Sequence, residues 1–337
     1  MSEQNIDTDN STTQSKTITD ANQSQHGDNG RPEGAATQNA TETSQRLPVQ
    51  KTYKLFIGGQ FPRSESGHYY QAMGTDGRML GNVCLASRKD LRDAVGAARS
   101  AQPAWGGRSA YNRSQILYRA AEMLEGRRVQ FEAELVEQGQ SQASARREVE
   151  AGIDRLIYYA GWADKYQQVF GAVNPVASSH FNFSVPDPTG VVVVLAPEEQ
   201  PLLALITLIA PVIVGGNTVI ALASYKAPLS AITLAEVLAT SDLPGGVVNI
   251  LTGKRSDLNE HLARHMDINA IVYAGEYGDE LRDMQNQAAE NVKRVIVRNQ
   301  IDWFSDAAET PYWIMDTQEI KTTWHPIEHI ASAGSKY

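Results

Sequence analysis

Five short apolar runs alternate with four helical stretches between residues 190 and 297, and this alternation constrains the fold more than any other feature. The runs read GVVVVLA, NTVIAL, VVNILTG, INAIVYAG and KRVIV. Continuous β-branched runs without polar alternation are typical of strands that are buried on both faces, as in parallel sheets. The order strand–helix–strand predicts an α/β fold, with a doubly wound parallel (Rossmann-like) sheet and helices on both of its faces.

In such a sheet the carboxyl ends of the strands form the binding edge. Here those ends read LAPEEQ, ALASYK, LTGKRS and YAGEYG. The first of them places two adjacent carboxylates, Glu198 and Glu199, at the edge. An acid/base pair is one interpretation, because neighbouring carboxylates can separate their pKa values. Consecutive side chains usually diverge, however, and no partner base or nucleophile is evident, so we favour a scaffold role.

The chain divides into three parts by composition. Residues 1–47 are rich in Ser, Thr, Asn, Gln, Asp and Gly, which predicts a disordered polar tail that cannot bury enough apolar surface to fold. A tail that binds a partner is the alternative. Residues 48–301 have a globular texture, with a hairpin excursion at 171–187. Residues 302–337 form a C-terminal segment, in which TQEIKTTW predicts a strand that pairs back onto an earlier element or onto another chain.

Two local features add detail. The stretch SRKDLRDAVGAARSAQPAW begins with Ser87 and has Asp90 three residues on, which predicts a capped helix ended by Pro103. Three of the five tryptophans fall in the C-terminal segment: Trp303, Trp313 and Trp324. We expect them to pack against a flank of the sheet or against a partner.

Charge and cysteine content limit the class of protein. A net charge of −9 gives no reason to bind nucleic acid or an anionic membrane. The longest apolar stretch, Leu202–Val214, is too short for a membrane span. The single cysteine, Cys84, permits neither an intramolecular disulfide nor a cysteine-based metal cluster, and suits the cytoplasm. His261 and His265 have the spacing of two metal ligands, but with no third ligand evident no metal site is predicted.

Three stretches have distinctive sequences: YYAGWADK, PTGVVVVLAP and GGNTVIALASYKAPLSAITLAEVLATSDLPGGVVNILTG. In order and spacing they resemble the aldehyde dehydrogenase superfamily, over Tyr53 to about Val297 and the C-terminal strand. The resemblance implies aldehyde oxidation with NAD or NADP. In that chemistry a cysteine thiolate attacks the carbonyl, an Asn side chain and a backbone N–H stabilise the oxyanion, and a Glu activates water.

The positions that match these catalytic residues depart from the family pattern. Glu199 stands where the family has the oxyanion Asn, and an ionised carboxylate cannot donate a hydrogen bond. Arg298 stands where the family has the general-base Glu, and a guanidinium cannot accept a proton. Cys84 lies in an early strand, and we interpret it as a packing residue. No catalytic residue is therefore assigned.

The cofactor positions have also changed. Leu222 replaces the family Lys that binds the adenosine ribose, and Tyr225 replaces the Glu that follows it. Glu276 puts a carboxylate where phosphate would lie. Weak, vestigial cofactor contacts are carried over to Ala196, Pro197, Ser224, Gly253 and Gly275. NAD or NADP is thus implied by resemblance, but tight binding is not expected.

The assembly elements of the family are retained. Residues 171–187 match its oligomerisation hairpin and TQEIKTTW its closing strand, while only about 40 residues follow Val297. We expect an internal loss of the catalytic domain, and a catalytically deficient protein that forms a homodimer or pairs with a full-length aldehyde dehydrogenase. One alternative is an NAD(P)-dependent aldehyde oxidoreductase, active alone or with a complementing subunit. Another is a nucleotide-binding module.

Overall fold

The computed structural model describes residues 49–327, so the tail predicted over residues 1–47 lies outside the described residues. The helices are α1 (Arg88–Gly106), α2 (Ala110–Gly126), α3 (Arg128–Glu137), α4 (Gln142–Trp162), α5 (Tyr166–Phe170), α6 (Pro201–Val214), α7 (Leu229–Ala239), α8 (Arg255–Arg264), α9 (Asp279–Ala289) and α10 (Tyr312–Met315). The strands are β1 (Thr52–Tyr53), β2 (Tyr69–Met73), β3 (Met79–Cys84), β4 (Ala172–Asn174), β5 (His180–Pro188), β6 (Val191–Leu195), β7 (Thr218–Leu222), β8 (Val248–Leu251), β9 (Ala270–Ala274), β10 (Arg294–Arg298) and β11 (Gln318–Pro326).

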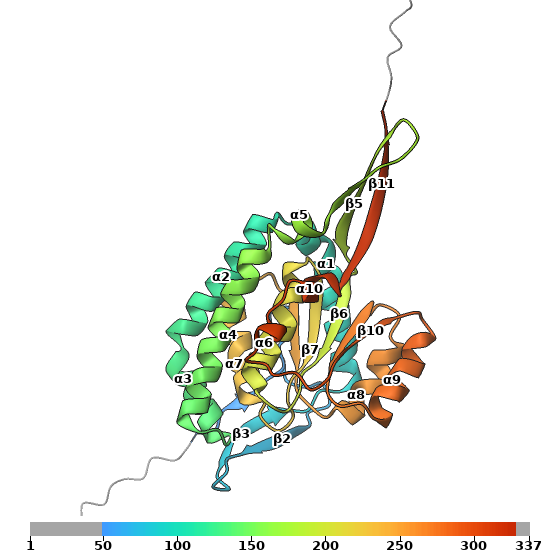
Figure 1. The fold of residues 1–337 in the computed structure, drawn as a ribbon. Helices are drawn as coiled ribbons and strands as arrows, with labels where there is room; N and C mark the ends of the chain where they lie inside the picture. The colour runs from blue at the N-terminus through green and yellow to red at the C-terminus, as the bar shows by residue number, and fades with distance from the viewer. Residues whose placement is uncertain (1–48, 328–337) are drawn as a thin grey trace, which may run out of the picture. The chain divides into compact units, whose positions relative to one another are not determined.

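The predicted parallel sheet is confirmed. Its strand order is β10-β9-β6-β7-β8, and every neighbouring pair runs parallel. From β6 the chain proceeds to β7 and β8 on one side, then returns to β9 on the other side (Figure 1). The topological switch point therefore lies between β6 and β9, at the carboxyl edge where such sheets bind ligands.

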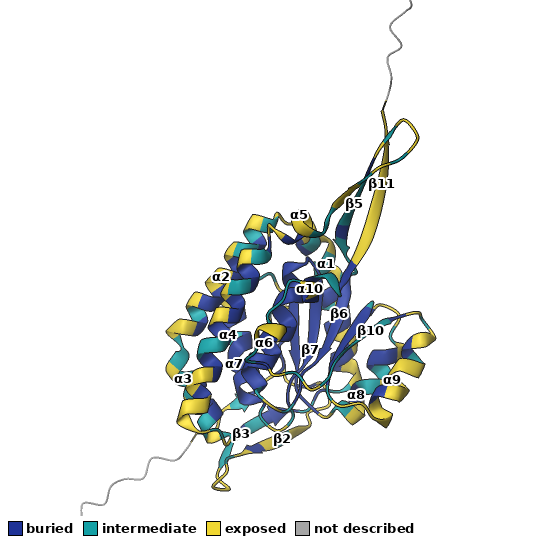
Figure 2. Cartoon of the chain, in the orientation of Figure 1, coloured by how far each residue is buried: buried dark blue, intermediate teal, exposed yellow. Residues whose placement is uncertain are grey.

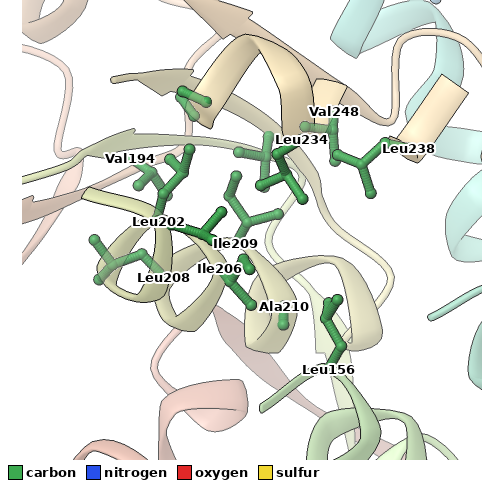
Figure 3. Close-up of a cluster of buried hydrophobic side chains, with 14 of the residues drawn as sticks. Leu156, Val194, Leu202, Ile206, Leu208, Ile209, Ala210, Leu234, Leu238 and Val248 are labelled. Atoms are coloured by element: carbon green, nitrogen blue, oxygen red, sulfur yellow. The ribbon is translucent and has the colours of Figure 1, made fainter. Parts of the chain in front are cut away.

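Helix α6 lies at the centre of the molecule, and every one of its residues is buried. Its side chains pack between β6, α4 and α7, as the close-up of Leu202, Ile206 and Ile209 shows (Figure 3). Each such side chain contributes about 1.5–3 kcal/mol by leaving water. Buried positions gather along the sheet and α6, while the outer faces of α2, α3 and α9 are exposed (Figure 2). Within residues 49–327 no helix is long and apolar enough to cross a membrane.

Helix α1 begins as predicted but does not end there. Ser87 and Asp90 form the expected capping box. The expectation that Pro103 ends the helix is wrong, because α1 continues to Gly106. The extra turn buries Trp105, whose indole Nε1–H donates to the carbonyl of Ile213 at 2.9 Å. We attribute the longer helix to this burial, which offsets the hydrogen bond that proline cannot make.

Three antiparallel strands form an arm that projects from the body (Figure 1). The order is β11-β5-β4, with β4 and most of β5 drawn from residues 171–187. Of the two pairings predicted for TQEIKTTW, the one with an earlier element is confirmed, since β11 pairs with β5 along its whole length. Beyond Gln318, β11 is exposed throughout, and Trp324 is 57% exposed there.

Residues 299–317, which we call the strap, connect β10 to β11 across the face of α6. Trp303 and Trp313 are buried in it and meet edge to face, with ring centroids 6.3 Å apart. Arg155 of α4, only 3% exposed, donates to the carbonyls of Trp303 at 3.1 Å and Ala308 at 2.5 Å. The strap is therefore an integral layer of the body, held by buried polar contacts.

The amino end of α6 is capped from outside the helix. Oε1 of Glu148, a fully buried residue of α4, accepts the backbone N–H groups of Leu202 at 2.8 Å and Leu203 at 3.1 Å. Its Oε2 accepts the amide of Gln140 at 2.5 Å. Burial raises the pKa of Glu148, against the effect of these three donors. The helix dipole and the free N–H groups that could hold an anion at this end are thus already engaged.

Glu148→Gln is expected to change the pH dependence of stability. Between the ordinary pKa of a Glu and the raised pKa of Glu148, the folded state binds more protons than the unfolded state, so the stability that this group contributes is lost as pH rises. As pH falls through that window, the free energy of unfolding of wild type should rise relative to that of the variant by up to about 1.4 kcal/mol per pH unit. Urea unfolding of both proteins between pH 7 and pH 5 measures it, and a pH-independent difference would contradict it.

Candidate functional site

A cavity of about 530 Å³ opens at the carboxyl edge of the sheet, beside the switch point. The loops that follow β6 and β9 line it, together with the first residue of α8 and the end of β10 with the first residues of the strap. Its lining residues are Pro197, Glu198, Glu199, Gln200, Arg255, Ala274, Gly275, Glu276, Glu280, Arg298, Asn299, Gln300, Ile301 and Trp303. The fold thus brings together several of the positions that the sequence singled out, although the lining comes from four different segments: Pro197, Glu198, Glu199, Gly275, Glu276 and Arg298 all line the cavity.

Glu198 links the ends of two neighbouring strands. Its carboxylate accepts the hydroxyl of Ser224 at 2.5 Å and the backbone N–H of Lys226 at 3.0 Å, and Oγ of Ser224 in turn accepts the N–H of Ala227 at 3.0 Å. Several hydrogen bonds to one carboxylate hold a loop strongly in its conformation. Glu198 therefore closes the junction between the loops after β6 and β7.

Glu199 has a different environment. It is exposed at the mouth of the cavity and makes no hydrogen bond or ion pair with another residue in the described part of the chain. Between it and α6, Gln200 adopts the left-handed conformation with φ 42°, which sets the turn into the helix. The two carboxylates therefore have separate partners and exposures. This arrangement favours the scaffold interpretation of Glu198 over an acid/base pair.

Arg298 is fastened to the strap. Its guanidinium forms an ion pair with Asp316 and lies 4.2 Å from the ring centroid of Trp313. Its backbone carbonyl accepts the N–H of Gly275 at 3.1 Å, which joins the ends of β9 and β10. A guanidinium in this position can pair with a carboxylate, but it has no free lone pair with which to accept a proton. The side chain of Arg298 thus takes part in the fold itself.

Arg255 is the residue that sequence reasoning missed. From the first turn of α8, its Nη2 reaches the carbonyls of Ala196 at 2.5 Å and Ala274 at 2.7 Å, which end β6 and β9. Its guanidinium therefore spans the switch point itself. The signal was available, because the strand end LTGKRS places Arg255 two residues after a glycine at the binding edge.

The expected cofactor positions are only partly together. Pro197 and Gly275 line the cavity and Ala196 lies directly beneath it, whereas Ser224 is engaged by Glu198. Gly253 lies apart, against the backbone of Ala86. The amino end of α9, where a pyrophosphate would need free N–H groups and positive potential, carries Glu276, Asp279 and Glu280. These residues do not fit a dinucleotide bound in the usual way at a helix amino end.

Cys84 lies outside the cavity. It is buried at the end of β3, and its carbonyl accepts the hydroxyl of Thr252 at 2.6 Å. It packs in the apolar layer with Leu55 and Leu91. Its environment is that of a small core residue.

A doubly wound parallel sheet with its site at the switch-point edge defines an α/β protein of the dinucleotide-binding architecture. Residues 61–299 match the sequence model of the aldehyde dehydrogenase family, and the chain belongs to that family. It is 33% identical over 248 residues to a D-glyceraldehyde dehydrogenase (NADP+) of Thermoplasma acidophilum, a match that covers 72% of this chain and 49% of that protein. It is also 33% identical to the mouse cytosolic 10-formyltetrahydrofolate dehydrogenase, with 74% and 28% covered.

Solved structures agree. The NAD+ complex of an aldehyde dehydrogenase from Bacillus cereus superposes with a TM-score of 0.70 at 25% identity, covering 74% of this chain and 51% of that one. A protein from Burkholderia cenocepacia, described as a possible aldehyde dehydrogenase, gives a TM-score of 0.69 at 29% identity, with 72% and 50% covered. The chain spans about half the length of these solved relatives.

Proposed function

We propose that this chain is a catalytically deficient member of the aldehyde dehydrogenase family that acts as an assembly or regulatory subunit. It forms a homo-oligomer or pairs with an intact aldehyde dehydrogenase. The observation that carries the proposal is Arg298, which stands at the general-base position and is tied to Asp316 and Trp313. A position that held the catalytic base would have no reason to carry a cation fastened to the fold.

Two further residues support the proposal that this chain has lost catalytic activity. Glu199 would repel a developing oxyanion where the family stabilises one. Cys84 is buried and remote from the carboxyl-edge cavity, so its thiol has no access to an aldehyde there. The alternative, an NAD(P)-dependent aldehyde oxidoreductase acting alone or with a complementing subunit, is favoured by the family match and by the NAD+ complex of a relative. We propose that NAD and NADP do not bind tightly. The side chains of Glu198 and Arg255 occupy the space at the strand ends, and the carboxylate of Glu276 would repel a cofactor phosphate there.

The arm supports an assembly role. Within residues 49–327 no strand pairs with the outer edge of β11, and Trp324 and Ile320 are both 57% exposed on this strand. Phe181 of β5 and Val173 of β4 add exposed apolar surface on the opposite face of the same sheet. Exposed apolar side chains beside a strand edge are typical of a protein–protein contact.

Size-exclusion chromatography with light scattering, alone and mixed with full-length aldehyde dehydrogenases, tests the assembly role. We expect a dimer or larger species at micromolar concentration. Trp324→Arg should weaken it at least about tenfold, because loss of a buried aromatic anchor costs about 2 kcal/mol or more. Tyr277→Arg is the matched control, since Tyr277 is also an exposed aromatic residue, 71% exposed, but lies after β9, away from the arm. A monomer that joins no full-length relative would refute the assembly role.

The catalytic part of the proposal has its own assay. With simple aldehydes and NAD or NADP we expect no formation of reduced cofactor and no saturable cofactor binding by calorimetry. Production of NADH or NADPH that Cys84→Ala abolishes would establish the enzyme alternative. Tight binding of either cofactor without turnover would instead favour a nucleotide-binding module.

A further inference from the structure

A second hollow lies between α1 and α8 and shares no lining residue with the carboxyl-edge cavity. Its volume is about 380 Å³. We call it the α1–α8 groove, and its lining residues are Arg88, Leu91, Arg92, Glu260, His261, Arg264 and His265. Leu91 is buried and belongs to the core, while the rest of the lining is polar. Three guanidinium groups and two imidazoles thus meet one carboxylate in a single small groove.

The positive charge of the groove is incompletely neutralised. Arg88 forms no ion pair with any residue between 49 and 327, and Arg92 approaches only Asp93, at 3.8 Å. Arg264 pairs with Glu260 at 3.3 Å and, more loosely, with Glu290 at 3.7 Å. Pairs of this exposure contribute little and break easily when a better anion is present. In a chain with a net charge of −9, this surplus of cations is local.

His265 adds a neutral donor. Its Nδ1 accepts the backbone N–H of Asp267 at 3.2 Å, so the neutral ring carries its proton on Nε2. Burial lowers the pKa of His265, and the charges of Lys293 and Arg99 lower it further, whereas Asp267 acts in the opposite direction. At neutral pH the ring is therefore uncharged and able to donate one hydrogen bond, in a region of positive potential.

We propose that the α1–α8 groove binds the phosphate group of a small phosphorylated metabolite, held by Arg88, Arg92, Arg264 and the Nε2–H of His265. Guanidinium groups match the geometry of phosphate and bind it through paired, charge-assisted hydrogen bonds. The volume falls in the range of small-molecule sites, about 300–1,000 Å³. This site is independent of the proposed assembly role.

Calorimetric titration of the full chain, in a phosphate-free buffer of low ionic strength, tests the site. The ligands are inorganic phosphate, glucose 6-phosphate and glucose. We expect saturable binding of both phosphates, tighter for the ester, and none of glucose. Arg88→Ala should weaken binding about tenfold or more, because a hydrogen bond to a charged group contributes about 1.5–3 kcal/mol. Glu260→Gln should strengthen it several-fold, since it frees Arg264 and removes the repelling carboxylate.

Arg282→Ala is the matched control. Arg282 is an exposed helix arginine with a close carboxylate, Asp279, but it lies on α9 and does not line the groove. Its variant should bind like wild type. Absence of saturable phosphate binding, equal binding by Arg88→Ala and wild type, or weaker binding by Glu260→Gln would each overturn the site. Equal affinity for inorganic phosphate and the ester would reduce it to a simple anion site and overturn the metabolite assignment.

Discussion

Replacing Arg155 by alanine is expected to lower the free energy of unfolding by about 3–5 kcal/mol, as breaking a buried charged network does. The guanidinium is buried and joins Thr207 of α6 at 2.9 Å to the carbonyls of Trp303 and Ala308 in the strap. It also lies 3.5 Å from the carboxylate of Glu309. Alanine would leave these acceptors without a donor, beneath a layer that water cannot easily enter.

Urea unfolding measures the loss of stability, and hydrogen exchange of residues 299–317 shows whether the strap opens first. Arg146→Ala is the control on the same helix, because Arg146 is exposed and pairs only with Glu150 at 3.0 Å. It should change stability by less than about 1 kcal/mol. If Arg155→Ala were no more destabilising than Arg146→Ala, the strap would not depend on this anchor.

Arg298→Glu puts a carboxylate at the position that we propose matches the family's general base, and we expect it to destabilise the protein by about 2–4 kcal/mol. The substitution removes the cation over Trp313 and sets a second carboxylate against Asp316. We expect no aldehyde oxidation from the variant, because Glu199 and the buried Cys84 are unchanged. A carboxylate at residue 298 would thus damage the fold without supplying chemistry.

A charge exchange isolates the pair. In the double variant Arg298→Glu with Asp316→Arg the ion pair is restored in reverse, so part of the lost stability should return, although the cation over Trp313 would not. Chemical unfolding of the two single variants and the double variant gives the coupling energy. Aldehyde oxidation by Arg298→Glu would contradict the catalytic deficiency, and strictly additive effects would contradict the ion pair.

The sheet could be predicted from sequence because its signal is local and repeated. Continuous apolar runs between helices specify parallel strands, and the residues that end each strand must share one edge. The same reasoning placed Glu198, Glu199 and Gly275 at that edge, and the structure puts all three around one cavity. Arg298, which only the family resemblance singled out, lines the same cavity. No knowledge of the chemistry was needed for this placement.

The partners of those residues could not be predicted. Glu198 is fastened to Ser224, and Arg298 to Asp316, by contacts between segments that only the folded chain brings together. Arg255 reaches the switch point through a long, flexible side chain, and no local pattern specifies its direction. The length of α1 was mistaken for a similar reason, because the burial of Trp105 against α6 overrides the local effect of Pro103.

The pairing of β11 with β5 has a consequence for the order of folding. These strands are separated in sequence by the entire parallel sheet and the strap, and their register joins Thr322 to Ser184. Contacts between such distant segments close a long loop and form slowly. We therefore expect the sheet and α6 to be structured in the transition state for folding, and the strands of the arm to pair only afterwards. Substitutions in β11 should accelerate unfolding and leave the refolding rate almost unchanged.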